Sequence, residues 1–219
     1  MSSALDVIFF FAGFLSAGLS FSTAYLMLVS FRTIRSEYLL GFPIGFSFLG
    51  LSYAFFGISH ILPMLADLAS WLHLFLGSYG LAFLASSYLL KKGSVSSSSS
   101  GQLARWSLLA LIVLGAFTVL IVVLSTSIFP PYQLADALFR ALNLGLLGYI
   151  IYSLNQALRT EVELSNVVLG FTFLTIEQYS LFLWTLDREF AWSFVFAQFV
   201  RVAGLAILTA FVVRGFQRK

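Results

Sequence analysis

The chain has 219 residues, of which 60% are hydrophobic and 10% are charged, and its mean hydropathy is +0.97. These values lie far outside the range of soluble domains and indicate an integral membrane protein. The net charge of +3 reflects basic residues in the connections and does not indicate nucleic acid or another acidic partner. Because the chain has no cysteine, disulfides, thiolate metal sites and iron–sulfur clusters are excluded.

Seven segments are long and apolar enough to cross a bilayer as helices. They cover residues 7–31, 39–62, 67–90, 106–129, 134–157, 164–186 and 190–213. The predicted fold class is therefore all-α integral membrane, with seven transmembrane helices. Residues 93–101 are almost entirely serine between two glycines, a composition typical of flexible linkers.

The distribution of basic residues predicts the orientation. Nine of the twelve follow the first, third, fifth or seventh segment: Arg32, Arg35, Lys91, Lys92, Arg105, Arg159, Arg214, Arg218 and Lys219. Only Arg188 lies in a connection on the opposite side. The positive-inside rule then places the N-terminus outside and the C-terminus in the cytoplasm. We therefore expect a multi-pass protein of the cell membrane.

Comparison of the chain with itself reveals an internal repeat. Residues 45–49 (GFSFL) return as 170–174 (GFTFL), and residues 80–84 (GLAFL) return as 204–208 (GLAIL). Residues 35–37 (RSE) return as 159–161 (RTE). These offsets are 125, 124 and 124 residues. We interpret residues 1–90 and 134–219 as a duplicated, parallel three-helix unit, joined by a linker and connector helix at 91–133 in a 3+1+3 arrangement.

This layout is similar to that of the SWEET sugar transporters, and the seven-helix rhodopsins have been described in the same way. The similarity is one of layout only, because the proline–glutamine pairs of the PQ-loop relatives are missing here. All three lysines, Lys91, Lys92 and Lys219, lie outside the predicted spans. A retinal Schiff base is therefore excluded.

Two opposite charges lie inside the last two predicted helices. Counted from the turn that these helices share, Glu177 lies about 13 Å and Arg201 about 16 Å below the same membrane surface, at about 1.5 Å of rise per residue. A lone charge at such a depth costs at least about 2.5 to 3.5 kcal/mol. We therefore expect the two side chains to face inward as partners.

Further polar side chains share faces with these charges. In the fifth segment, Asp136, Arg140 and Asn143 lie on one helix face, and Gln198 lies on the Arg201 face of the seventh. The predicted ligand or ion-pair site consists of Glu177, Arg201, Arg140, Gln198 and Asn143. The alternative is a buried pair that only fixes helix register, with Arg140 reaching the outer surface past Asp136.

The two histidines, His60 and His73, lie toward the outer ends of neighbouring predicted helices. Two such residues could hold a haem or help to hold a metal ion. Their depths of about 3 Å and about 10 Å below the surface differ, however, which fits poorly with two axial ligands on one iron. We therefore predict interfacial histidines and no haem.

The sequence contains no nucleophile with its base, phosphate-binding loop or spaced carboxylate pair, so we do not expect an enzyme. The favoured hypothesis is a protein that binds a small ligand, ion or proton in a pocket opening to the outside, for transport or sensing. The alternative is an accessory or structural subunit of a larger membrane protein complex. In either class we expect contact with the lipid bilayer and with another membrane protein or a second copy of the chain.

Overall fold

The computed structural model of the chain describes residues 4–34, 37–93, 115, 132–158, 164–187 and 191–217. Six long helices lie in these ranges: α1 (Ala4–Ile34), α2 (Gly41–Ile61), α3 (Ala66–Gly93), α5 (Tyr132–Leu158), α6 (Ser165–Leu186) and α7 (Ala191–Gln217). Each is long and apolar enough to cross a membrane. The all-helical fold and six of the predicted spans are therefore confirmed, and the protein is a multi-pass membrane protein.

The predicted fourth span, residues 106–129, lies outside the described residues except for Gly115. The seven-helix count and the serine-rich linker therefore remain predictions. The same is true of the orientation, because most of the basic residues behind it also lie outside the described residues or have side chains that are not described.

The described turns at the ends of α2 and α6 follow from local chemistry. Pro63 has no backbone N–H and begins the 3-10 turn η2 (Pro63–Leu65) directly after α2. The N–H of Leu62 donates to the carbonyl oxygen of Ile58 at 3.0 Å and closes the end of α2. At the end of α6, Asp187 takes an extended conformation. A second 3-10 turn, η1 (Glu37–Leu40), precedes α2.

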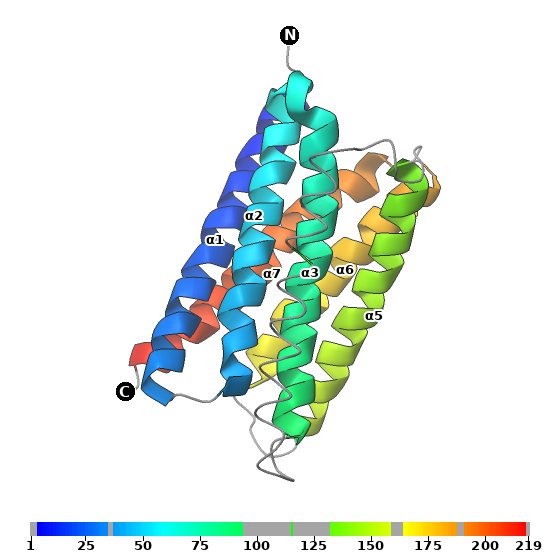
Figure 1. Cartoon of the computed structure of the whole chain (residues 1–219). Coiled ribbons are helices and arrows are strands. Elements are labelled where there is room, and N and C mark those ends of the chain that lie inside the picture. Colours follow the sequence, from blue (N-terminus) through cyan, green and yellow to red (C-terminus); the bar gives the residue numbers. More distant parts are fainter. Residues whose placement is uncertain are drawn as a thin grey trace.

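The six helices form a closed ring in the order α1, α2, α3, α5, α6, α7, with α7 packed back against α1. Helices α1, α3, α5 and α7 run in one direction along the bundle, and α2 and α6 run in the other (Figure 1). We call α1–α3 the first half and α5–α7 the second half. The end with the α2–α3 turn is called the outer end, after the predicted orientation, and the opposite end the inner end.

Glycines allow two pairs of helices to cross closely. A Cβ atom on Gly45 of α2 would lie 2.8 Å from the carbonyl oxygen of Gly80 in α3, and one on Gly80 would lie 2.9 Å from that of Gly45. In the second half, a Cβ atom on Gly170 would lie 3.2 Å from the carbonyl oxygen of Gly204, and one on Gly204 would lie 3.0 Å from that of Gly170. The glycines that matched in sequence therefore lie at close crossings of α2 with α3 and of α6 with α7.

The outward surface of the ring is apolar. Large side chains such as Phe11 in α1, Leu138 in α5 and Phe199 in α7 are exposed, with 64%, 60% and 67% of their surface accessible. In a chain of membrane-spanning helices these side chains contact the lipid bilayer. The five polar side chains of the predicted ligand or ion-pair site are by contrast buried.

Candidate functional site

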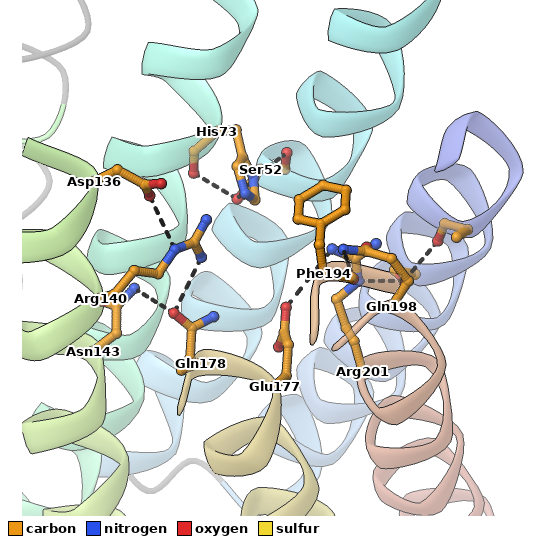
Figure 2. A network of polar contacts seen from close by, with 12 residues as sticks. Ser52, His73, Asp136, Arg140, Asn143, Glu177, Gln178, Phe194, Gln198 and Arg201 are labelled. Atoms are coloured by element: carbon orange, nitrogen blue, oxygen red, sulfur yellow. Dashed lines mark hydrogen bonds and ion pairs between the residues drawn. The ribbon is translucent and has the colours of Figure 1, made fainter. Parts of the chain in front are cut away.

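Glu177 of α6 and Arg201 of α7 face each other inside the ring, as predicted (Figure 2). Their side chains are 1% and 0% exposed, and Nη1 of Arg201 lies 3.7 Å from Oε1 of Glu177. This distance defines an ion pair but is too long for a direct hydrogen bond. Neither carboxylate oxygen of Glu177 has a hydrogen-bond donor among the described residues.

The first half of the chain holds the Arg201 guanidinium. The Cζ atom of Arg201 lies 4.6 Å from the ring centre of Tyr53 and 4.7 Å from that of Phe56, both in α2. The Nε atom of Arg201 donates a hydrogen bond to Ser16 Oγ of α1 at 3.0 Å. Cation–π contacts of this kind are worth about 2 kcal/mol at desolvated sites. Arg201 therefore connects the two halves of the ring.

Arg140 of α5 belongs to a second polar unit. Its Nε atom donates to Asp136 Oδ1 at 3.0 Å, and its Nη1 atom donates to Gln178 Oε1 at 3.2 Å. The side-chain amide of Asn143 donates to the same oxygen at 3.2 Å. The alternative in which Arg140 extends to the outer surface is wrong, because its side chain is 8% exposed and turned toward Gln178.

Gln198 does not join these units through its side-chain amide. That amide donates to the carbonyl oxygen of Phe194 in its own helix at 3.2 Å, although the residue is only 3% exposed. The structure therefore brings Glu177 and Arg201 together, and places Arg140 and Asn143 in a neighbouring unit through Gln178. The sequence analysis missed Gln178, which accepts hydrogen bonds from Arg140 and Asn143. Its position directly after Glu177 could have indicated that it lies near the same polar side chains.

The two histidines occupy different surroundings. His73 is buried, and its Nδ1 atom lies 2.8 Å from Ser52 Oγ. The Nδ1 atom of His60 lies 2.9 Å from the carbonyl oxygen of Phe56, one turn earlier in α2. The Phe56 ring contacts both imidazoles, at centroid distances of 4.6 and 5.2 Å. No group of three or more His, Cys, Asp or Glu side chains in the described part of the chain could hold a metal ion.

Aromatic contacts join the two halves in the outer part of the ring. Between α1 and α7, the rings of Phe9 and Phe194 meet edge-on at 4.9 Å, and His60 packs edge-on against Phe9 at 5.2 Å. Between α3 and α5, the rings of Trp71 and Tyr132 meet edge-on at 5.4 Å. We call these five residues the outer seal, because they close both junctions between the halves.

A small cavity of about 10 Å³ lies among the polar side chains inside the ring. Its polar lining, which we call the polar layer, consists of Ser52, Tyr53, His73, Arg140, Asn143, Glu177 and Gln178. Several buried atoms of this layer have no hydrogen-bond partner among the described residues, including Nε2 of His73 and Oδ1 of Asn143. The volume suffices for about one water molecule. A haem does not fit there.

A much larger cavity of about 500 Å³ lies at the inner end. We call it the inner cavity, and all six helices contribute to its wall. The aromatic side chains of this wall are Phe42, Phe46, Tyr88, Tyr149, Tyr152, Phe171 and Phe211. Whether the large cavity opens to the outside, as expected, depends on the predicted orientation, which makes its end of the ring the inner one. Only the small cavity reaches Glu177.

Buried apolar side chains separate the two cavities. This apolar layer consists of Phe46, Leu49, Leu147, Phe171 and Leu174, none more than 2% exposed. Phe46 and Phe171 line the inner cavity, whereas the three leucines line the small one. Along the axis of the ring the order is therefore inner cavity, apolar layer, polar layer and outer seal. Similarity searches add no assignment, because no family model, curated protein or solved structure matches the chain.

Proposed function

We propose that this chain is a seven-helix, transporter-like protein of the cell membrane that binds a small ligand inside its ring and is not an enzyme. The two three-helix halves would move against each other, so that the ligand site opens alternately to either side. The observation that carries the proposal is the order of layers along the ring axis. A cavity of about 500 Å³ lies at one end, while aromatic contacts join the two halves at the other end.

The size and wall of the inner cavity favour a ligand over a purely structural role. Small-molecule sites have volumes of roughly 300 to 1,000 Å³, with mostly apolar walls and a few polar groups. The inner cavity falls in this range. A bundle whose helices served only to pack against one another would fill such a space with side chains.

The contacts between the halves support the idea that the halves can separate at the outer end. The hydrogen bond from Arg201 to Ser16 and its contacts with Tyr53 and Phe56 all cross from the second half to the first. The ion pair with Glu177 lies wholly within the second half. Opening the outer end would break the first set of contacts and leave the ion pair intact, so Arg201 would keep a partner throughout.

The predicted internal repeat supports the same division of the chain. The Gly45–Gly80 and Gly170–Gly204 crossings are both close, and the ring closes through α3 with α5 and through α7 with α1. These two junctions correspond to each other if α1–α3 match α5–α7. Two similar halves that meet at two similar junctions are the arrangement that alternating access requires.

Cysteine accessibility tests this proposal, and the absence of native cysteine means that each variant carries a single thiol. Ala157→Cys places it in the inner cavity and Leu74→Cys in the small cavity. A membrane-impermeant maleimide added to inside-out vesicles should label Ala157→Cys rapidly. Added to intact cells, it should label Leu74→Cys only slowly, because the outer end is closed.

Adding Ser16→Ala to Leu74→Cys removes one contact that holds the outer end closed. A hydrogen bond is worth about 1 kcal/mol, so labelling from outside should become about fivefold faster. Met64→Cys is the control, because Met64 lies in the turn at the outer end and is 99% exposed. Its labelling should not respond to Ser16→Ala. If Leu74→Cys stays unlabelled from outside in both backgrounds, the alternative of an accessory subunit is preferred.

A further inference from the structure

A stripe of hydrogen-bonding side chains runs along the face of α5 that lines the inner cavity. Four residues with the spacing i, i+3, i+4 and i+7 lie on one side of the helix: Tyr149, Tyr152, Ser153 and Gln156. None of these four side chains hydrogen-bonds to another described residue. We call them the α5 stripe. Their hydroxyl and amide groups are therefore available to a molecule in the cavity.

The walls contributed by α6 and α7 are different in chemistry. The side chains that line the cavity from these helices are Val167, Phe171, Leu208, Phe211 and Val212, all of them apolar. The cavity thus has hydrogen-bonding groups on α5 and an apolar surface on α6 and α7, and Thr23 of α1 with Ser87 and Tyr88 of α3 adds hydroxyl groups between these walls. A bound molecule that satisfies both walls needs an apolar body and a polar edge.

Among the residues that the structure describes, no charged side chain lines the inner cavity. Moving an ionised group from water into such a space without a partner is very unfavourable. The charged residues of the polar layer, Arg140 and Glu177, lie beyond the apolar layer and line only the small cavity. The described part of the wall therefore favours uncharged ligands, and its aromatic side chains offer surfaces on which a flat ring can stack.

We infer that the inner cavity binds an uncharged, ring-bearing molecule whose hydroxyl or carbonyl group hydrogen-bonds to the α5 stripe. This inference rests on the proposed function and specifies its ligand class. The apolar walls of α6 and α7 contact the ring. The stripe then orients the polar edge of the ligand toward α5.

Protection of a thiol in the cavity tests this inference with defined probes. In purified Ala157→Cys protein, the rate of alkylation by a small maleimide is measured with increasing 2-naphthol, naphthalene, naphthalene-2-sulfonate or glucose. We expect 2-naphthol to protect the thiol most strongly, naphthalene more weakly, and the charged and the polyhydroxyl probes not at all. Gly148→Cys on the same helix is the control for general effects of each probe on the membrane or micelle.

A second variant tests the α5 stripe itself. Tyr149→Phe combined with Ser153→Ala, in the Ala157→Cys background, removes two hydroxyl groups and leaves the ring of residue 149 in place. The concentration of 2-naphthol needed for half-protection should rise at least about fivefold, as expected for one lost hydrogen bond. The value for naphthalene should not change.

Three results would overturn the inference. Equal protection by naphthalene and 2-naphthol would indicate a site for plain apolar chains, such as the acyl chain of a lipid. Protection by the sulfonate or glucose that matches 2-naphthol would indicate a different ligand class. Free alkylation that no probe slows would refute the ligand class and leave the transport proposal standing, whereas an unreactive thiol without any probe would refute the open cavity and both proposals.

Discussion

The Glu177–Arg201 pair gives the sharpest stability prediction. At 3.7 Å and an effective dielectric constant of about 20, the attraction between the two charges is about 4 kcal/mol. Replacing one partner removes this attraction and leaves the other charge buried. Breaking a buried pair in this way typically destabilises a protein by about 3 to 5 kcal/mol.

The structure predicts that the two single substitutions are unequal. Glu177→Leu leaves Arg201 with the Ser16 hydrogen bond and two aromatic rings, so we expect a loss of about 3 kcal/mol. Arg201→Met leaves the Glu177 carboxylate without a hydrogen-bond donor among the described residues, so we expect a loss of about 5 kcal/mol. The double variant removes both charges, and we expect it to lose less than either single variant, because replacing a buried ion pair by apolar side chains of similar volume leaves no charge unpaired and is often nearly neutral.

These free energies can be measured by unfolding the purified protein with sodium dodecyl sulfate in mixed micelles. Ser180→Ala serves as a control on α6, because the Ser180 hydroxyl donates only to the carbonyl oxygen of Ile176 in its own helix. We expect a change of at most about 1 kcal/mol there. If the double variant loses as much as the two single variants together, the charges are not coupled and the reasoning fails.

Three further predictions concern packing, cofactors and topology. Gly170→Leu should lower the free energy of unfolding by at least about 1 to 3 kcal/mol, because the larger side chain overpacks the crossing of α6 and α7. Gly148→Leu, whose side chain meets open space, should change it by less than about 0.5 kcal/mol. Equal effects of the two substitutions in the unfolding assay would contradict the helix crossing. Changing His60 or His73 to glutamine should leave the visible absorption spectrum unchanged and alter stability by about 1 kcal/mol, and a Soret band lost in both variants would show a haem. An epitope tag at the N-terminus should be reached by antibody on intact cells, and one at the C-terminus only after permeabilisation; both tags on one side would refute the seven-helix count.

The spans and the central ion pair could be predicted from sequence because each depends on a simple count. Apolar length identifies membrane helices, and the distance of Glu177 and Arg201 from a shared turn sets their depth. The contacts of Arg201 with Tyr53 and Phe56 could not be predicted in this way. Among 25 phenylalanines and 9 tyrosines, nothing in the sequence distinguishes a ring that faces the interior from one that faces lipid.

The position of the inner cavity also escaped prediction. Whether a space forms inside a ring depends on how far apart the helices lie, and that distance results from packing between segments remote in sequence. The residues of the α5 stripe have the spacing of a single helix face, but an equivalent face made of tyrosine, serine and glutamine is equally compatible with the membrane interface. The charges of Glu177 and Arg201 predicted a site in the middle of the membrane, whereas the larger cavity lies toward one end of the ring.

The cross-half contacts of Arg201 have a consequence for biosynthesis. Helices enter the membrane in chain order, so Ser16, Tyr53 and Phe56 are already inserted when α7, the last described helix, leaves the ribosome. All partners of Arg201, including Glu177 on the preceding helix, are therefore already in the bilayer when Arg201 enters it. A truncated chain that stops before α7 would leave the Glu177 carboxylate stranded in the membrane, and cellular quality control should recognise and degrade it.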